Sequence, residues 1–155
     1  MNMLSGLFTS SIGKKIIMSL TGLFLCVYLV VHLGGNLLLL KQDGGAAFDQ
    51  YAEILPSLLF IRIIEIGLFA VFILHIVQGT ILWMQNRSAR PVRYVVNKPQ
   101  ENSSVFSRTM FVTGSFVFIF LVLHIRTFWV TSRFYHEENP SMYKIAVDAF
   151  TSPVY

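Results

Sequence analysis

The sequence predicts an all-α integral membrane protein, a transmembrane helix bundle with three full helices and the start of a fourth. Of its 155 residues, 54% are hydrophobic and only 13% are charged, which is about half the charged fraction of a typical soluble domain. The charges are clustered between three long apolar runs, and each run contains one histidine: His32, His75 or His124. The bilayer is therefore the expected solvent, and residues 1–155 are expected to form one domain.

The first apolar run extends from Ile16 to Leu40 and has 25 residues without a charge. About 20 residues cross the hydrocarbon core of a bilayer, so the first transmembrane helix is predicted over residues 16–40. A polar connection follows from Lys41 to Glu53, and its two adjacent glycines predict a turn.

The second predicted helix covers residues 54–85, with Pro56 in its first turn, where proline is tolerated. The third covers residues 105–133. Beyond it, residues 141–155 have the pattern of an amphipathic helix and are interpreted as the start of a further helix.

The distribution of basic residues predicts the orientation of these helices. Lys14 and Lys15 precede the first helix, and the polar segment 87–108 carries five basic residues against Glu101 alone, whereas the connection 41–53 is acidic. Because cytoplasmic loops are enriched in Lys and Arg, the amino terminus and the segment 87–108 are expected in the cytoplasm. The formal net charge of +4 therefore reports topology, and no nucleic-acid partner is expected.

This orientation places the three histidines at two depths. His32 and His124 each lie nine residues before the basic residue that ends their outward-running helix, so they share a level near the outer face. His75 lies 12 residues before Arg87. It is therefore expected nearer the cytoplasm, by about 6 to 15 Å at 1.5 Å per residue.

Histidine inside a membrane is costly and indicates a functional site, and imidazole is a common axial ligand of haem iron. The hypothesis is that His32 and His124 ligate one outer haem b, and that His75 ligates an inner haem b whose second ligand lies outside these residues. Covalent haem attachment is excluded, because Cys26 is the single cysteine and no Cys-x-x-Cys-His motif occurs. The alternative is hydrogen bonding between helices without a cofactor. His136 lies in a polar segment and is expected to be solvated.

Two threonines share the helix faces of these histidines. Thr21 precedes His32 by 11 residues, and Thr113 precedes His124 by 11, which is close to three helical turns. Each is a candidate to hydrogen-bond a group near the inner haem. The alternative is a hydroxyl bonded to the backbone of its own helix.

Several short stretches together resemble a known family. They are Ser-Ile-Gly-Lys-Lys at 11–15, Leu-Thr-Gly-Leu-Phe-Leu at 20–25, His-Leu-Gly-Gly-Asn at 32–36, Arg-Ile-Ile-Glu at 62–65, His-Ile-Val-Gln-Gly at 75–79, Asn-Arg-Ser-Ala-Arg-Pro-Val-Arg-Tyr at 86–94, Tyr-Lys-Ile at 143–145 leading to Phe150, and Pro-Val-Tyr at 153–155. Across essentially the whole chain, the sequence resembles the cytochrome b membrane-anchor subunit of bacterial succinate dehydrogenase or fumarate reductase, in particular its dihaem type.

The resemblance implies five transmembrane helices, two b haems and four histidine ligands. This chain supplies three helices and three of the ligands, so it is expected to be either part of a longer chain or a genuine short form. The resemblance also implies the bacterial cytoplasmic (inner) membrane, a flavoprotein and an iron–sulfur subunit on the cytoplasmic side, and a membrane quinone as substrate. The basic segment 87–108 is the expected docking surface, and a dimer of such complexes is compatible with this pattern.

In such a complex, succinate or fumarate chemistry belongs to the flavoprotein, and this subunit would carry electron transfer and quinone chemistry. Quinone chemistry needs a proton acceptor, and Glu65 is the first candidate, with an ion pair to Arg62 as its alternative. Glu53 is the second candidate. Arg126 is a candidate partner of a haem propionate, with snorkelling to the interface as its alternative.

Two other functions fit the same residues. One is a different dihaem membrane cytochrome b that carries electrons without dehydrogenase subunits. The other is a non-redox helical membrane anchor whose histidines only pack or relay protons.

Overall fold

The computed structural model describes residues 3–89, 96, 98–134 and 141–152. Within these residues every regular element is helical, which confirms the predicted all-α class. The elements are α1 (Met3–Thr9), α2 (Ser11–Asn36), the 3₁₀ turn η1 (Leu37–Leu40), α3 (Ala46–Ser57), α4 (Leu59–Ser88), α5 (Pro99–Asn102), α6 (Val105–His124), the π-helical segment η2 (Ile125–Val130), α7 (Thr131–Phe134) and α8 (Met142–Thr151).

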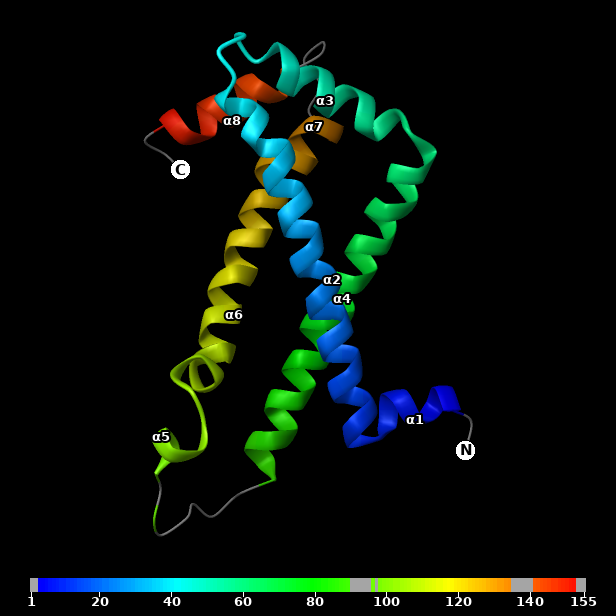
Figure 1. Cartoon of the computed structure of the whole chain (residues 1–155), viewed down its shortest axis with the longest axis vertical. Helices are drawn as coiled ribbons and strands as arrows, with labels where there is room; N and C mark the ends of the chain where they lie inside the picture. The colour runs from blue at the N-terminus through cyan, green and yellow to red at the C-terminus, as the bar shows by residue number, and fades with distance from the viewer. Residues whose placement is uncertain (1–2, 90–95, 97, 135–140, 153–155) are drawn as a thin grey trace.

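Three segments of the described chain are long and apolar enough to cross a membrane: Ser11–Leu40, Leu59–Ser88 and Val105–Phe134, each of 30 residues. In Figure 1 they run roughly along the long axis of the molecule, and α2 crosses α4 near the middle. The side chains on their outer surfaces are large, apolar and exposed, as expected for helices whose solvent is lipid.

The chain enters the first span through a sharp corner between α1 and α2 (Figure 1). Ser10 forms the N-cap of α2, where its hydroxyl oxygen accepts a hydrogen bond from the Gly13 backbone N–H at 3.0 Å. Gly13 permits the corner, because a Cβ there would overlap the backbone of Leu7. The first span is thus α-helical from Ser11 to Asn36 and closes in the η1 turn.

The predicted second helix was wrong at its start. Residues 54–57 belong to α3, a separate helix that lies across one end of the bundle, and the second span begins only at Leu59. Pro56 therefore lies in the last turn of α3 and not in the first turn of the span. The break is local, because Leu58 adopts an extended conformation with φ −82° and ψ 122° between the two helices.

The final helix, α8, also lies across that end of the bundle (Figure 1). It covers Met142–Thr151 and packs against α3. The helix predicted in this part of the chain is therefore present, and its role as the start of a further span stays a prediction. The Asp49 carboxylate fastens the two helices, since it accepts hydrogen bonds from the Ser141 hydroxyl at 2.6 Å and from the Tyr143 backbone N–H at 2.8 Å. We call α3 and α8 together the end cap.

The two most buried apolar side chains of the described residues, Phe48 and Ala146, lie in the end cap and are 7% and 3% exposed. The turn before α3 depends on glycine, because Gly44 and Gly45 have φ angles of 68° and 91°. In addition, the Tyr143 ring lies directly against Gly45, leaving no room for a Cβ.

Candidate functional site

The imidazole rings of His32 and His124 meet between α2 and α6. Their centroids are 5.7 Å apart and their planes are at 87° to one another. Both side chains are partly buried. These two residues therefore share a level in the bundle, as the sequence predicts, while their role as iron ligands stays a prediction.

Aromatic rings surround this histidine pair. Tyr28 stacks on His32 with centroids 5.4 Å apart. On the other helix, Phe120 stacks on His124 at 5.4 Å and Phe128 lies at 4.9 Å. The pair thus lies in an apolar, aromatic environment, which holds both imidazoles in position from either side.

His75 lies on α4 and contacts α2 instead of the other two histidines. Its Nδ1 is 2.8 Å from the Thr21 hydroxyl oxygen, and that hydroxyl also donates to the Ile17 carbonyl at 2.8 Å. A hydroxyl has one proton. Because the Thr21 hydroxyl is also within hydrogen-bond distance of a carbonyl, the arrangement favours Nδ1 as the donor to Thr21, a tautomer that leaves the lone pair of the His75 ring on Nε2.

The contact with Thr21 also fixes the level of His75. Thr21 precedes His32 by 11 residues of one continuous helix, so the two levels are separated by about 16 Å along α2. Two glycines lie at this contact of α4 with α2: a Cβ at Gly22 would lie 3.4 Å from His75 Cε1, and one at Gly79 would lie 3.5 Å from the Met18 methyl group, both at ordinary van der Waals distance. The bundle therefore holds two separate histidine levels, as predicted.

The two threonine predictions have different outcomes. Thr21 contacts both its own helix and His75. Thr113 is exposed, and its hydroxyl donates to the Thr109 carbonyl at 3.2 Å and to the Met110 carbonyl at 3.1 Å. Thr113 thus shows the backbone-bonded alternative.

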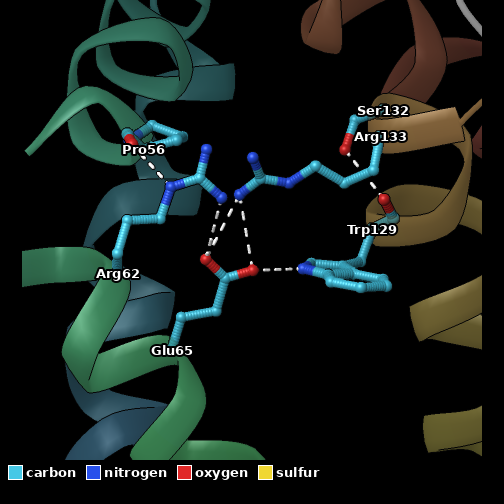
Figure 2. A network of polar contacts seen from close by, with 6 residues as sticks. All are labelled: Pro56, Arg62, Glu65, Trp129, Ser132 and Arg133. Carbon is cyan, nitrogen blue, oxygen red and sulfur yellow. Dashed lines mark hydrogen bonds and ion pairs between the residues drawn. The ribbon is translucent and has the colours of Figure 1, made fainter. Parts of the chain in front are cut away.

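Glu65 lies at the centre of the polar cluster in Figure 2. Its Oε2 is 3.4 Å from Arg62 Nη1 and 3.2 Å from Arg133 Nη2, and its Oε1 accepts hydrogen bonds from Arg133 and from the Trp129 indole N–H. The ion pair with Arg62 that the sequence offered as an alternative is therefore present. The cluster joins α4 to the end of the third span.

Trp129 and Arg133 were not predicted as partners of Glu65, from which they are 64 and 68 positions distant. Their spacing of four residues places them on one helix face, which was a usable signal. The sequence did not predict the π-helical segment Ile125–Val130. This segment follows His124 and determines the direction in which Trp129 and Arg133 point.

The side chains of the remaining candidates, Glu53 and Arg126, are exposed and form fewer contacts. Glu53 is exposed on α3, and Arg126 is exposed on the π-helical segment. In the described part of the chain, no hydrogen bond or ion pair involves either of these side chains. His136 and the basic residues at 90 and 93 lie outside the described residues.

One buried polar atom near His75 lacks a partner. The Gln78 Oε1 atom, one turn beyond His75 on α4, is buried and accepts no hydrogen bond from the residues that the structure describes. Buried polar atoms are usually satisfied, so this level of the bundle leaves a position for an additional group.

The donor set at both levels suits haem iron. Each protein-bound b haem needs two imidazoles at most. The structure supplies an edge-to-face pair of imidazoles in His32 and His124 and a single imidazole in His75, whose Nδ1 contacts Thr21. The described residues contain no group of three or more His, Cys, Asp or Glu side chains, and a haem site does not require one. The residues present therefore fit the group.

Comparison with protein-family models, with curated proteins and with solved structures finds no match to this chain.

Proposed function

We propose that this chain is the membrane-anchor cytochrome b subunit of a succinate:quinone oxidoreductase in the bacterial cytoplasmic membrane, with its amino terminus in the cytoplasm. Its partners would be a flavoprotein subunit, an iron–sulfur subunit and a membrane quinone. The observation that carries the proposal is the meeting of His32 and His124 at 5.7 Å from two different apolar helices. One imidazole in a membrane is readily explained by helix packing, whereas two imidazoles that meet from different helices are the donor set of a bis-histidine iron site.

Haem b, when bound, supplies one-electron transfer. In this proposal His32 and His124 hold the outer haem, and His75 provides one ligand of the inner haem. Thr21 holds the His75 ring with Nε2 free, and Arg126 remains the candidate for a propionate. Two imidazole ligands leave no open iron position, which favours electron transfer over oxygen binding.

Quinone reduction consumes protons as well as electrons, and Glu65 and Glu53 are the carboxylates proposed for this role. Glu65 is held by two arginines and an indole. Glu53 is exposed on the end cap. Exchange of each for glutamine, assayed by quinone turnover with the flavoprotein present, would separate the two: the proton-path residue is expected to lose at least about tenfold in turnover.

The proposal is tested by measuring haem b per copy of this subunit in the detergent-purified complex, using the pyridine haemochrome assay. His32→Ala and His124→Ala are each expected to remove the same haem, because the two residues ligate one iron. His75→Ala is expected to remove a different haem and to leave the first in place. His136→Ala is the matched control, for which no haem loss is expected.

The alternatives make different predictions for the same sample. A colourless wild-type protein would overturn the cytochrome proposal and favour a non-redox anchor. A protein that holds haem but copurifies with no flavin or iron–sulfur subunit would favour a different dihaem electron carrier.

A further inference from the structure

The cluster around Glu65 carries one surplus positive charge. Arg62 and Arg133 each contribute one positive charge, and Glu65 contributes one negative charge. In the part of the chain that the structure describes, no second carboxylate pairs with either arginine. An unbalanced charge at the edge of an apolar span is costly, so the cluster favours an additional anion.

The geometry leaves donors for such an anion. One nitrogen of each guanidinium lies within 3.4 Å of the same Glu65 oxygen, so the two groups lie side by side (Figure 2). Arg62 Nε donates to the Pro56 carbonyl at 2.9 Å, but Arg62 Nη2 and Arg133 Nη1 form no hydrogen bond within the described residues. Guanidinium groups arranged in this way match the oxygens of a phosphate.

The cluster also lies where lipid headgroups would be found. Arg62 is in the first turn of α4, and Arg133 precedes the last residue of the third span, Phe134. Both positions are at the end of the bundle that carries the end cap (Figure 1). The arginine side chains are 44% and 24% exposed, so a headgroup can reach them. Trp129 adds the aromatic ring that is typical of this depth.

We propose that Arg62 and Arg133 together bind the phosphate of an anionic phospholipid, such as phosphatidylglycerol, at the capped end of the bundle. A lipid with net charge −1 neutralises the surplus charge of the cluster. A zwitterionic lipid such as phosphatidylcholine has the same phosphate, but its ammonium group cancels this advantage. The site is therefore selective for headgroup charge.

The test is native mass spectrometry of the detergent-purified protein, titrated with phosphatidylglycerol or phosphatidylcholine of identical acyl chains. The wild-type protein is expected to bind phosphatidylglycerol about fivefold more tightly, the effect of one basic residue near a charged headgroup. Arg62→Gln removes the surplus charge but keeps the contacts of Glu65 with Arg133 and Trp129. It is expected to reduce the preference to about one.

Two further variants sharpen the test. Glu65→Gln raises the surplus charge to two and is expected to increase the preference for phosphatidylglycerol. Lys41→Gln is the matched control, because Lys41 is an exposed cation at the C-cap of η1, where the first span ends, and it lies outside the cluster. It is expected to leave the preference unchanged.

Equal binding of the two lipids to the wild-type protein would overturn the proposal, as would equal losses in Arg62→Gln and Lys41→Gln. Loss of haem from Arg62→Gln with an unchanged lipid preference would also overturn it, and would assign the cluster to the haem. Because the lipid readout does not depend on haem content, failure of the cytochrome proposal leaves this result interpretable.

Discussion

The end cap and the middle of the spans are held together by different interactions. In the end cap, Asp49 joins α3 to α8 through two hydrogen bonds and Phe48 is buried. In the middle of the spans, α2 and α4 are joined by van der Waals contacts around Gly22 and Gly79 and by the hydrogen bond between Thr21 and His75. The difference follows from the solvent, since apolar side chains gain little by leaving lipid. We therefore expect the contacts of the end cap to contribute most to the free energy of unfolding. The hydrogen bond between Thr21 and His75 in the middle of the spans is expected to contribute less and to position the imidazole ring.

The largest loss of stability is expected for Gly45→Ala. Its φ of 91° disfavours any L side chain by about 1 to 2 kcal/mol, and the Tyr143 ring occupies the space of the new methyl group. The apparent melting temperature in detergent is expected to fall markedly. Gly34→Ala on α2 is the control, because a methyl group there would meet nothing within 4 Å. A similar fall in both variants would contradict the distinction between cap and span.

A loss of about 2 kcal/mol in unfolding free energy is expected for Asp49→Ala, which leaves the Tyr143 N–H and the Ser141 hydroxyl without their charged acceptor. The measurement is unfolding of the purified protein in mixed micelles. Asp148→Ala removes an exposed carboxylate of α8 and is expected to change the free energy little. Equal losses of unfolding free energy in Asp49→Ala and Asp148→Ala would contradict the role of Asp49 in joining α3 to α8.

Trp129→Phe is expected to cost about 1 kcal/mol. The phenyl ring can keep the contact with Phe69, whose ring centroid is 5.3 Å from that of Trp129, but the hydrogen bond to Glu65 is lost. Thermal unfolding in detergent measures the change. Destabilisation that is absent in a Glu65→Met background, which has no side-chain oxygen to accept the indole N–H, would show that the loss arises from this hydrogen bond. An equal loss in both backgrounds would exclude it.

The smallest effect on stability, below about 1 kcal/mol, is expected for Thr21→Val. Its effect on His75 is expected to be specific, because the variant removes the acceptor that fixes the ring with Nε2 free. In the haem-loaded complex, the reduction potential of one haem is therefore expected to shift, and the other is expected to stay constant. Thr113→Val is the control, since Thr113 is bonded only to its own helix. Equal shifts in both variants would contradict a role for Thr21 in positioning His75.

Long apolar runs and their basic flanks predicted the three spans and the two histidine levels. The depth of a residue could be predicted because each residue of a helix adds a fixed rise of about 1.5 Å from the helix boundary. Of the two helices in the end cap, α3 was missed for a physical reason. This 12-residue helix is stabilised by Ser141 and Tyr143, which are 92 and 94 positions from Asp49. Within the span, the pairing of Glu65 with Arg62, one turn away, was predicted as an alternative and is present, whereas Arg133 is brought near only by the fold.

The π-helical segment Ile125–Val130 has a consequence for how this sequence can vary. A π turn accommodates one residue more than an α turn, and each residue rotates a helix by about 100°. Deletion of one residue within the segment would let the π turn close to an α turn and would keep Trp129 and Arg133 on the face that meets Glu65. A change that converts the segment to an α turn without a deletion would instead turn both residues away from Glu65 by about 100° while His124 kept its place. A one-residue deletion is therefore expected to be tolerated here better than in the regular turns of the span.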